Sequence, residues 1–129
     1  MKKSNLKKIV ASVSMFAIVI CLVSFINVTK WDVPAADAGI KNPVKADAAS
    51  IAAGKTEFTK SCKSCHGATG VGVGKMADPS NFTTKEFKAQ SDGAIYFKIS
   101  TGHGKMPAYK SKIKADNDRW NLVNYMRTL

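Results

Sequence analysis

The stretch SCKSCHGATG, Ser61–Gly70, places Cys62 and Cys65 three positions apart and puts His66 directly after the second cysteine. The whole chain has only three cysteines and two histidines. Closely spaced cysteines occur in structural zinc sites, in redox dithiols or disulfides, and at points where a prosthetic group is attached covalently. Which of these applies depends on what the rest of the chain offers.

Zinc binding and thiol redox chemistry both lack the partners that they need. A structural zinc ion takes four Cys or His ligands, but His103 is the only other histidine and there is no second C-x-x-C pair. A thioredoxin-like dithiol belongs to a strand-helix-strand pattern, and no stretch of the chain alternates apolar and polar residues as a strand does. A zinc site, a dithiol and a plain disulfide are therefore disfavoured alternatives.

The motif fits covalent haem attachment better. In C-x-x-C-H both thiols can add to the two vinyl groups of a haem, while the histidine that follows turns its imidazole toward the iron. We therefore expect one haem, bound through thioether bonds from Cys62 and Cys65, with His66 as the proximal iron ligand.

The opposite side of the iron has three candidate ligands, Met76, His103 and Met106. Met106 lies in GHGKMPAY, Gly102–Tyr109, where Pro107 stiffens the backbone directly after it. Haem iron accepts either a thioether or an imidazole in this position. We expect Met106 to be the distal ligand, with His103 and Met76 as less favoured alternatives.

Three segments have the pattern of helices, and the expected fold class is all-α. They are Ser50–Ser61, Ser91–Gly102, and a last helix from Asp116 or Asn117 to the end of the chain, and each first residue is an expected N-cap. A domain of this size with long loops has only a marginal apolar core. A large buried cofactor would supply what that core lacks.

Basic and apolar segments precede this domain. Residues 1–8 are a basic n-region, residues 9–26 are an apolar membrane anchor or signal, and residues 27–49 have the composition of an extended linker before a domain at 50–129. The eighteen uncharged residues fit a retained anchor better than a cleaved signal. Cys21, within this run, is expected to be an inert apolar side chain. The lysines before the run predict a cytoplasmic N-terminus and a domain on the outer, periplasmic side of the cytoplasmic membrane.

The chain is strongly basic, with a net charge of +11. Its lysines are scattered rather than gathered on a helix that could read bases, so nucleic acid is not an expected partner. A basic surface favours acidic docking surfaces on partner proteins instead. The lysines expected near the haem edge are Lys63, Lys75, Lys98, Lys105 and Lys110.

Residues 51–129 resemble the class I monohaem c-type cytochromes, small electron carriers with three or more helices folded around one haem. AAGKTEFTKSCKSCHG looks like the first helix and haem motif of this family, with Gly54 and Phe58 at its glycine and aromatic positions. The resemblance implies that these two residues pack against the last helix, at Leu122 and Tyr125.

Two further features follow from the same resemblance. The sequence MPAY matches the family's Met-Pro-Ala-aromatic motif, which supplies the distal ligand, here Met106. The carbonyl of Pro79 is the implied acceptor for the second ring N–H of His66. Side chains that are candidates to wall the haem are Phe58, Phe82, Tyr96, Ile99 and Trp120.

The expected function is that of a membrane-tethered electron carrier and not of an enzyme. It would move one electron at a time between respiratory complexes, such as a quinol-oxidising complex and a terminal oxidase. Two alternatives stay open. One is a haem sensor or peroxidase-like protein with a labile sixth ligand and His103 as an acid-base group; the other is a haem subunit that is fixed permanently in an oxidase or reductase.

Overall fold

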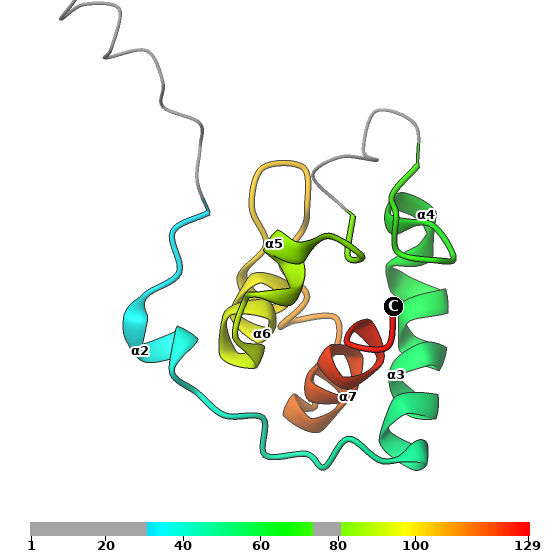
Figure 1. The fold of residues 1–129 in the computed structure, drawn as a ribbon, viewed down its shortest axis with the longest axis horizontal. Helices are drawn as coiled ribbons and strands as arrows, with labels where there is room; N and C mark the ends of the chain where they lie inside the picture. The colour runs from blue at the N-terminus through cyan, green and yellow to red at the C-terminus, as the bar shows by residue number, and fades with distance from the viewer. Residues whose placement is uncertain (1–30, 74–80) are drawn as a thin grey trace, which may run out of the picture. The chain divides into compact units, whose positions relative to one another are not determined.

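The computed structural model describes residues 31–73 and 81–129. Of the two units into which the chain divides, Met1–Asp32 and Val33–Leu129, the second holds every helix in these residues. The helices, labelled in Figure 1, are α2 (Ala35–Ala38), α3 (Ala48–Ser61), α4 (Lys63–His66), α5 (Lys85–Lys88), α6 (Asp92–Thr101) and α7 (Asp116–Met126). Extended pairing in the described part of the chain is one isolated bridge. The all-helical prediction is confirmed, and α3, α6 and α7 are the three predicted helices.

Helices α3 and α7 pack directly on each other, and we call this pair the helix frame (Figure 1). Gly54 lies at the contact, because a Cβ on it would stand 2.0 Å from the carbonyl oxygen of Asn121 and 2.8 Å from Cβ of Tyr125. Phe58, one turn later, places its ring 5.2 Å from that of Tyr125. The predicted contact of both residues with the last helix is confirmed, and Asn121 rather than Leu122 is the nearest neighbour of Gly54.

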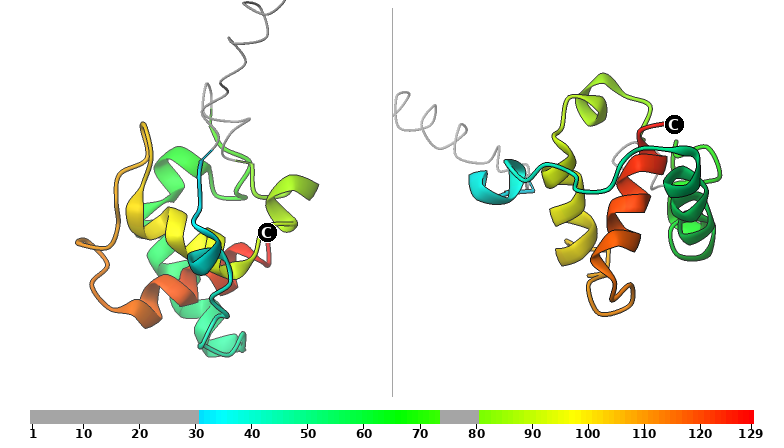
Figure 2. Two further views of the ribbon diagram at one scale, coloured as in Figure 1. Left: turned by 90° about the vertical axis from the view of Figure 1, so that its left-hand side faces the viewer. Right: turned by 90° about the horizontal axis from the view of Figure 1, so that it is seen from below.

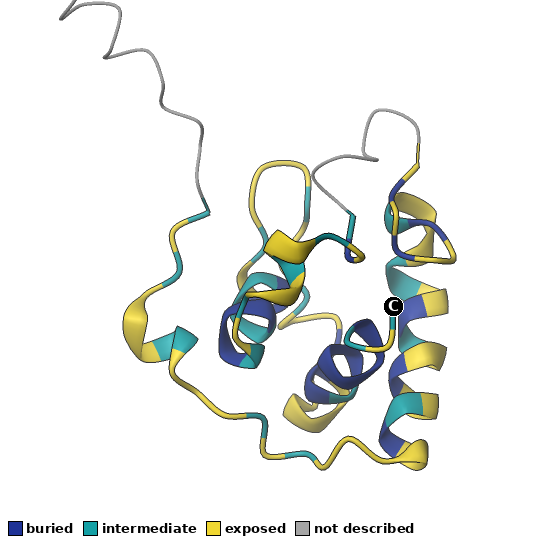
Figure 3. Ribbon diagram, in the orientation of Figure 1, coloured by how far each residue is buried: buried dark blue, intermediate teal, exposed yellow. Residues whose placement is uncertain are grey.

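The apolar core lies where α3, α6 and α7 meet. Figure 3 shows that α7 is buried over most of its length, whereas the outer side of α3 is exposed. Ile95 and Ile99, one turn apart in α6, are both buried, as their spacing predicts. The core residues are Phe58, Phe82, Ile95, Ile99, Ile113, Trp120, Leu122, Val123, Tyr125 and Met126. Tyr96 is half-buried and stacks on Trp120 with the ring centroids 3.9 Å apart.

The start of α3 differs from the prediction that Ser50 is its N-cap. The helix begins two residues earlier, and the carboxylate of Asp47 accepts a hydrogen bond of 2.9 Å from the amide of Ser50. Ser50 is buried, and its hydroxyl donates to Oδ1 of Asn121 and accepts from Nδ2 of Asn124, each at 2.7 Å. A carboxylate three residues upstream had the better cap geometry, so Ser50 joins the two frame helices instead.

The two later helices differ in how well their starts were predicted. Ser91 caps α6 as expected, and Gly102, with φ of 65°, ends it. The expected cap of α7 by Asp116 or Asn117 is wrong, because Ala115 occupies the N-cap position and has no side-chain acceptor. Asp116 is the first helical residue, and its carboxylate binds side chains of the domain instead of the helix amides.

The described part of the predicted linker lies against α6 and α7 (Figure 2). A Cβ on Gly93 of α6 would stand 2.2 Å from the carbonyl oxygen of Asp37, so the two backbones nearly touch. The side-chain amide of Asn42 donates to Oδ1 of Asn124 in α7 at 2.8 Å. The predicted domain boundary at residue 50 stays a prediction, but residues 33–49 contribute packing to the domain.

The predicted membrane segment is not described by the structure. Residues 1–8 and 9–26, with Cys21, lie outside the described residues. Over residues 31–73 and 81–129, none of the helices has the length and apolar character that crossing a membrane requires. The anchor and its orientation therefore stay predictions.

Candidate haem site

The haem motif, Cys62–His66, occupies a single helical turn. The amides of Cys65 and His66 both donate to the carbonyl oxygen of Cys62, at 3.1 and 3.0 Å. Gly67, with φ of 73°, then ends α4. The backbone therefore holds the two thiols and the imidazole within one turn, which is the arrangement that C-x-x-C-H attachment needs.

Neither cysteine of the motif forms a disulfide. Cys65 is exposed, and Cys62 is half-buried. Before any attachment, burial raises the pKa of the Cys62 thiol to about 12, with the charges of Glu57 and Cys65 adding to the effect. Among the described side chains, no three of His, Cys, Asp or Glu gather as a metal site. The disfavoured zinc and disulfide alternatives gain no support from these residues.

Aromatic packing holds the proposed proximal ligand, His66. Its ring stacks on that of Phe82, with the centroids 4.6 Å apart and the planes at 27°. Phe82 is buried and meets Phe58 edge to face at 6.2 Å, and Phe58 in turn contacts Tyr125. This chain of rings joins the imidazole to the helix frame and restrains its plane. The implied acceptor, Pro79, lies outside the described residues.

The proposed distal ligand lies on a loop that folds back on itself, and we call Gly102–Tyr109 the methionine loop. His103 and Met106 exchange two backbone hydrogen bonds of 2.9 Å. A Cβ on Gly102 would stand 2.5 Å from the carbonyl oxygen of Met106, so the loop closes over its own first residue. Met106 is half-buried and packs on the core, whereas His103 is exposed. Met76, the third candidate, lies outside the described residues.

Tyr109 brings the methionine loop to the haem motif. Its hydroxyl donates to the carbonyl oxygen of Ser61, the residue before Cys62, at 2.8 Å, although 48 positions separate the two residues in the sequence. Burial is the largest cause that raises the pKa of Tyr109, so its hydroxyl is a donor over the physiological range. In the sequence, Tyr109 is recognisable only as the aromatic end of MPAY, and its hydroxyl, which phenylalanine lacks, is the signal for this bond.

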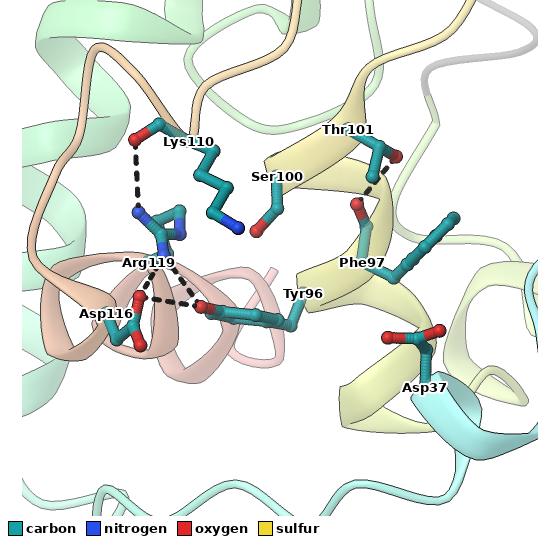
Figure 4. A pocket seen from close by; sticks show the side chains of 8 residues that line it. All are labelled: Asp37, Tyr96, Phe97, Ser100, Thr101, Lys110, Asp116 and Arg119. Atoms are coloured by element: carbon teal, nitrogen blue, oxygen red, sulfur yellow. Dashed lines mark hydrogen bonds and ion pairs between the residues drawn. The ribbon is translucent and has the colours of Figure 1, made fainter.

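Arg119 holds the segment that follows the methionine loop, and it was missed in the sequence. The side chain is only 1% exposed. Its guanidinium donates to the carbonyl oxygens of Ile113 and Lys114. It also donates to the Tyr96 hydroxyl at 2.7 Å and to the carboxylate of Asp116 (Figure 4). Arginine is mostly exposed in proteins, and no local pattern marks a buried one.

A pocket of about 290 Å³ opens beside Arg119. Figure 4 shows the side chains that line it, which are Asp37, Tyr96, Phe97, Ser100, Thr101, Lys110, Asp116 and Arg119. The proposed attachment residues and iron ligands, Cys62, Cys65, His66 and Met106, are not among them, whereas Tyr96, a candidate to wall the haem, is.

The residues that the structure brings together fit a c-type haem. Cys62, Cys65 and His66 offer two free thiols and an imidazole on one turn. A hydrogen bond ties the loop that carries the thioether of Met106 to that turn. Two thiols, an imidazole and a thioether are the donor set that covalent haem sites of electron-transfer proteins use.

Comparison with known families identifies the kind of domain to which these residues belong. A family model described as cytochrome c oxidase, cbb3-type, subunit III, matches residues 49–126, a range that includes the haem motif and the methionine loop. A search of curated proteins found no match. The predicted resemblance is confirmed: the chain belongs to this family, and residues 49–126 form a c-type cytochrome domain whose cofactor is haem.

Proposed function

We propose that the domain is a one-electron carrier that holds one haem covalently through Cys62 and Cys65 and ligates its iron with His66 and Met106. The observation that carries this proposal is the 2.8 Å hydrogen bond between the methionine loop and the residue before the haem motif. It supports a thioether on the distal side of the haem. Iron with both axial positions filled favours electron transfer over the binding of small molecules.

The haem would supply an iron centre that gains and loses one electron. The protein's own residues would keep that centre in a fixed position and shield it from water. The turn Cys62–His66 fixes the two attachment points relative to the imidazole, and Phe82 restrains the imidazole by stacking. The buried side chains of Phe58 and Ile99 help to exclude water. A thioether from Met106 would favour the reduced iron and raise the reduction potential relative to a second imidazole.

The surroundings of His103 favour the carrier over a haem sensor or peroxidase-like protein. An acid-base role would require its imidazole to work in a sheltered distal pocket. His103 is instead exposed, while Met106 is the residue of this turn that packs on the core.

The spectrum of the purified ferric holoprotein tests the ligand assignment. We expect a weak thioether-to-iron charge-transfer band that Met106→Leu abolishes. Met126→Leu is the matched control, because Met126 is a buried methionine of α7, 6% exposed, to which the proposal gives no role at the iron. Ready binding of carbon monoxide by the unmodified reduced protein would contradict the carrier and favour the sensor.

The exposed lysines support docking to acidic surfaces of redox partners, such as a quinol-oxidising complex and a terminal oxidase. Lys63, Lys105 and Lys110 are exposed. Lys98 is half-buried and hydrogen-bonded within the domain, and burial lowers its pKa, so we leave it out of this surface. Lys75 lies outside the described residues.

We also propose that residues 9–26 tether the domain to the outer side of the cytoplasmic membrane. Purification from membranes under native conditions tests this proposal together with the fixed-subunit alternative. We expect a separate protein whose intact mass equals the whole chain plus one haem. Recovery in constant ratio with an oxidase or reductase would instead support a permanent subunit, and a mass without the first residues would show cleavage.

A further inference from the structure

Tyr109 is held from three directions. Its amide donates to the carbonyl oxygen of Ile99 at 3.0 Å, which ties it to α6. Its carbonyl oxygen accepts from the amides of Lys112 and Ile113, at 3.0 and 2.8 Å, which begins the next turn of the chain. The hydroxyl bond to Ser61 differs from these bonds, because it reaches the end of α3. Through this one side chain, α6, the methionine loop and α3 are joined.

The positions of these bonds relative to the proposed iron ligands give Tyr109 a particular role. Met106 lies three residues before Tyr109, and Ser61 directly precedes Cys62. The methionine loop is short, so Tyr109 and Met106 can shift only together. The backbone at Gly102 and the bond to Ile99 attach the loop to α6, whereas the hydroxyl bond attaches it to the end of α3, next to the haem motif. Loss of the hydroxyl bond would therefore let Met106 move away from the haem motif.

We propose that Tyr109 is a positioning residue whose hydroxyl bond to Ser61 keeps the thioether of Met106 on the haem iron. The inference rests on the proposed function, because it requires Met106 to be the distal ligand. Tyr109 acts only through Met106. Its backbone bonds place the loop on the domain, and its hydroxyl bond sets the loop's distance from the haem motif.

The Tyr109→Phe holoprotein tests this role, because the change removes the hydroxyl and keeps the ring. Loss of one hydrogen bond shifts an equilibrium by roughly three- to ten-fold. Carbon monoxide reaches the reduced iron only after Met106 leaves it, so we expect its binding rate to rise by that factor. The reduction potential should fall as well, while haem content stays at one per chain.

Thr56→Val is the matched control. It also removes one hydroxyl that donates to a carbonyl oxygen, here that of Ala52 within α3 at 3.0 Å, on an exposed part of the helix. Neither of these two residues has a proposed role at the haem. We expect Thr56→Val to change the carbon monoxide binding rate less than two-fold.

The outcomes separate failure of the inference from failure of the proposed function. If the unmodified protein lacks the thioether band, the proposed function is wrong and the inference falls with it. If the band is present and Tyr109→Phe leaves the binding rate and the potential unchanged, or Thr56→Val changes them equally, the inference alone is wrong. Should Tyr109→Phe yield no holoprotein, proton NMR of the reduced unmodified protein decides, because a Tyr109 hydroxyl proton that exchanges freely with water would overturn the inference.

Discussion

The helix frame and the methionine loop are held in place by different kinds of interaction. In the frame, the backbones of α3 and α7 touch at Gly54, and the rings of Phe58 and Tyr125 pack beside that contact. Met106 and Tyr109 of the methionine loop pack on the core but are only half-buried. The loop is otherwise held by the close turn at Gly102 and by hydrogen bonds, among them that of the Tyr109 hydroxyl.

Because of this difference, the stability of the fold and the ligation of the iron should respond to different substitutions. Packing between two fixed backbones cannot yield locally, so a change in the frame is felt by the whole domain. A loop held by a few hydrogen bonds can shift while the rest of the domain stays folded. We therefore expect frame variants to change stability, and loop variants to change the distal ligand more than they change stability.

The largest expected effect is that of Gly54→Ala. The added Cβ would stand 2.0 Å from the carbonyl oxygen of Asn121, and this backbone atom cannot turn away. Overpacking usually costs about 1–3 kcal/mol, and we expect more than about 3 kcal/mol here because both helices would have to separate. Holoprotein yield and the denaturant midpoint measure the loss.

Gly39→Ala is the control for this prediction. The nearest atom to a Cβ at Gly39 would be 3.4 Å away, an ordinary contact. Its unfolding free energy should stay within about 0.5 kcal/mol of the unmodified protein. A Gly54→Ala protein that is as stable as Gly39→Ala would show that the helix frame yields locally, and the comparison with the loop would lose its basis.

Gly102→Ala should have a smaller effect on stability but a clear one on the iron. Its φ of 65° strains any side chain, and a Cβ would meet the backbone of Met106 and Ala108 at 2.5 Å. We expect a loss of about 1–3 kcal/mol of stability together with loss of the thioether band and a lower reduction potential. Spectroscopy and potentiometry of the folded variant measure these changes.

Gly104→Ala separates strain from close contact. Its φ of 57° is similar, but nothing lies within 4 Å of a Cβ there. It should lose a similar amount of stability from strain, about 1 kcal/mol, and keep the thioether band. If both variants lose the band equally, the close contact at Gly102 does not position Met106.

The presence of α3, α6 and α7 was largely predictable from the sequence, because the signals for a helix are local. The glycine at Gly54 is costly inside a helix, and the spacing of Ile95 and Ile99 marks the buried face of α6. The contact of Gly54 and Phe58 with α7 was predicted from the family resemblance rather than from such signals. The haem motif is a short stretch that carries its chemistry in its own residues.

The features that the sequence did not reveal depend on distant partners. Arginine is a residue type that is usually exposed, and the burial of Arg119 is made tolerable by the carbonyl oxygens of residues 113 and 114, the Tyr96 hydroxyl and the Asp116 carboxylate. Residues 33–49 have a linker's composition, yet their backbone docks on Gly93, which offers no side chain to signal the contact. The start of α3 was ambiguous because Asp47 and Ser50 are both good N-cap residues.

The smallest expected effects concern the starts of the frame helices. Asp47→Ala removes the carboxylate that caps α3 and should cost about 1 kcal/mol. Ala115→Ser should instead raise the free energy of unfolding by about 0.5–1 kcal/mol. The reason is that Ala115 has an extended backbone, φ of −73° and ψ of 127°, and α7 has no side-chain cap.

Neither residue belongs to the methionine loop. Both variants should therefore move the denaturant midpoint, in opposite directions, and leave the thioether band and the carbon monoxide binding rate of the reduced protein unchanged. A more than two-fold change of that rate in Asp47→Ala would mean that the stability of the frame itself controls the distal ligand, and the separation between frame and loop would be wrong.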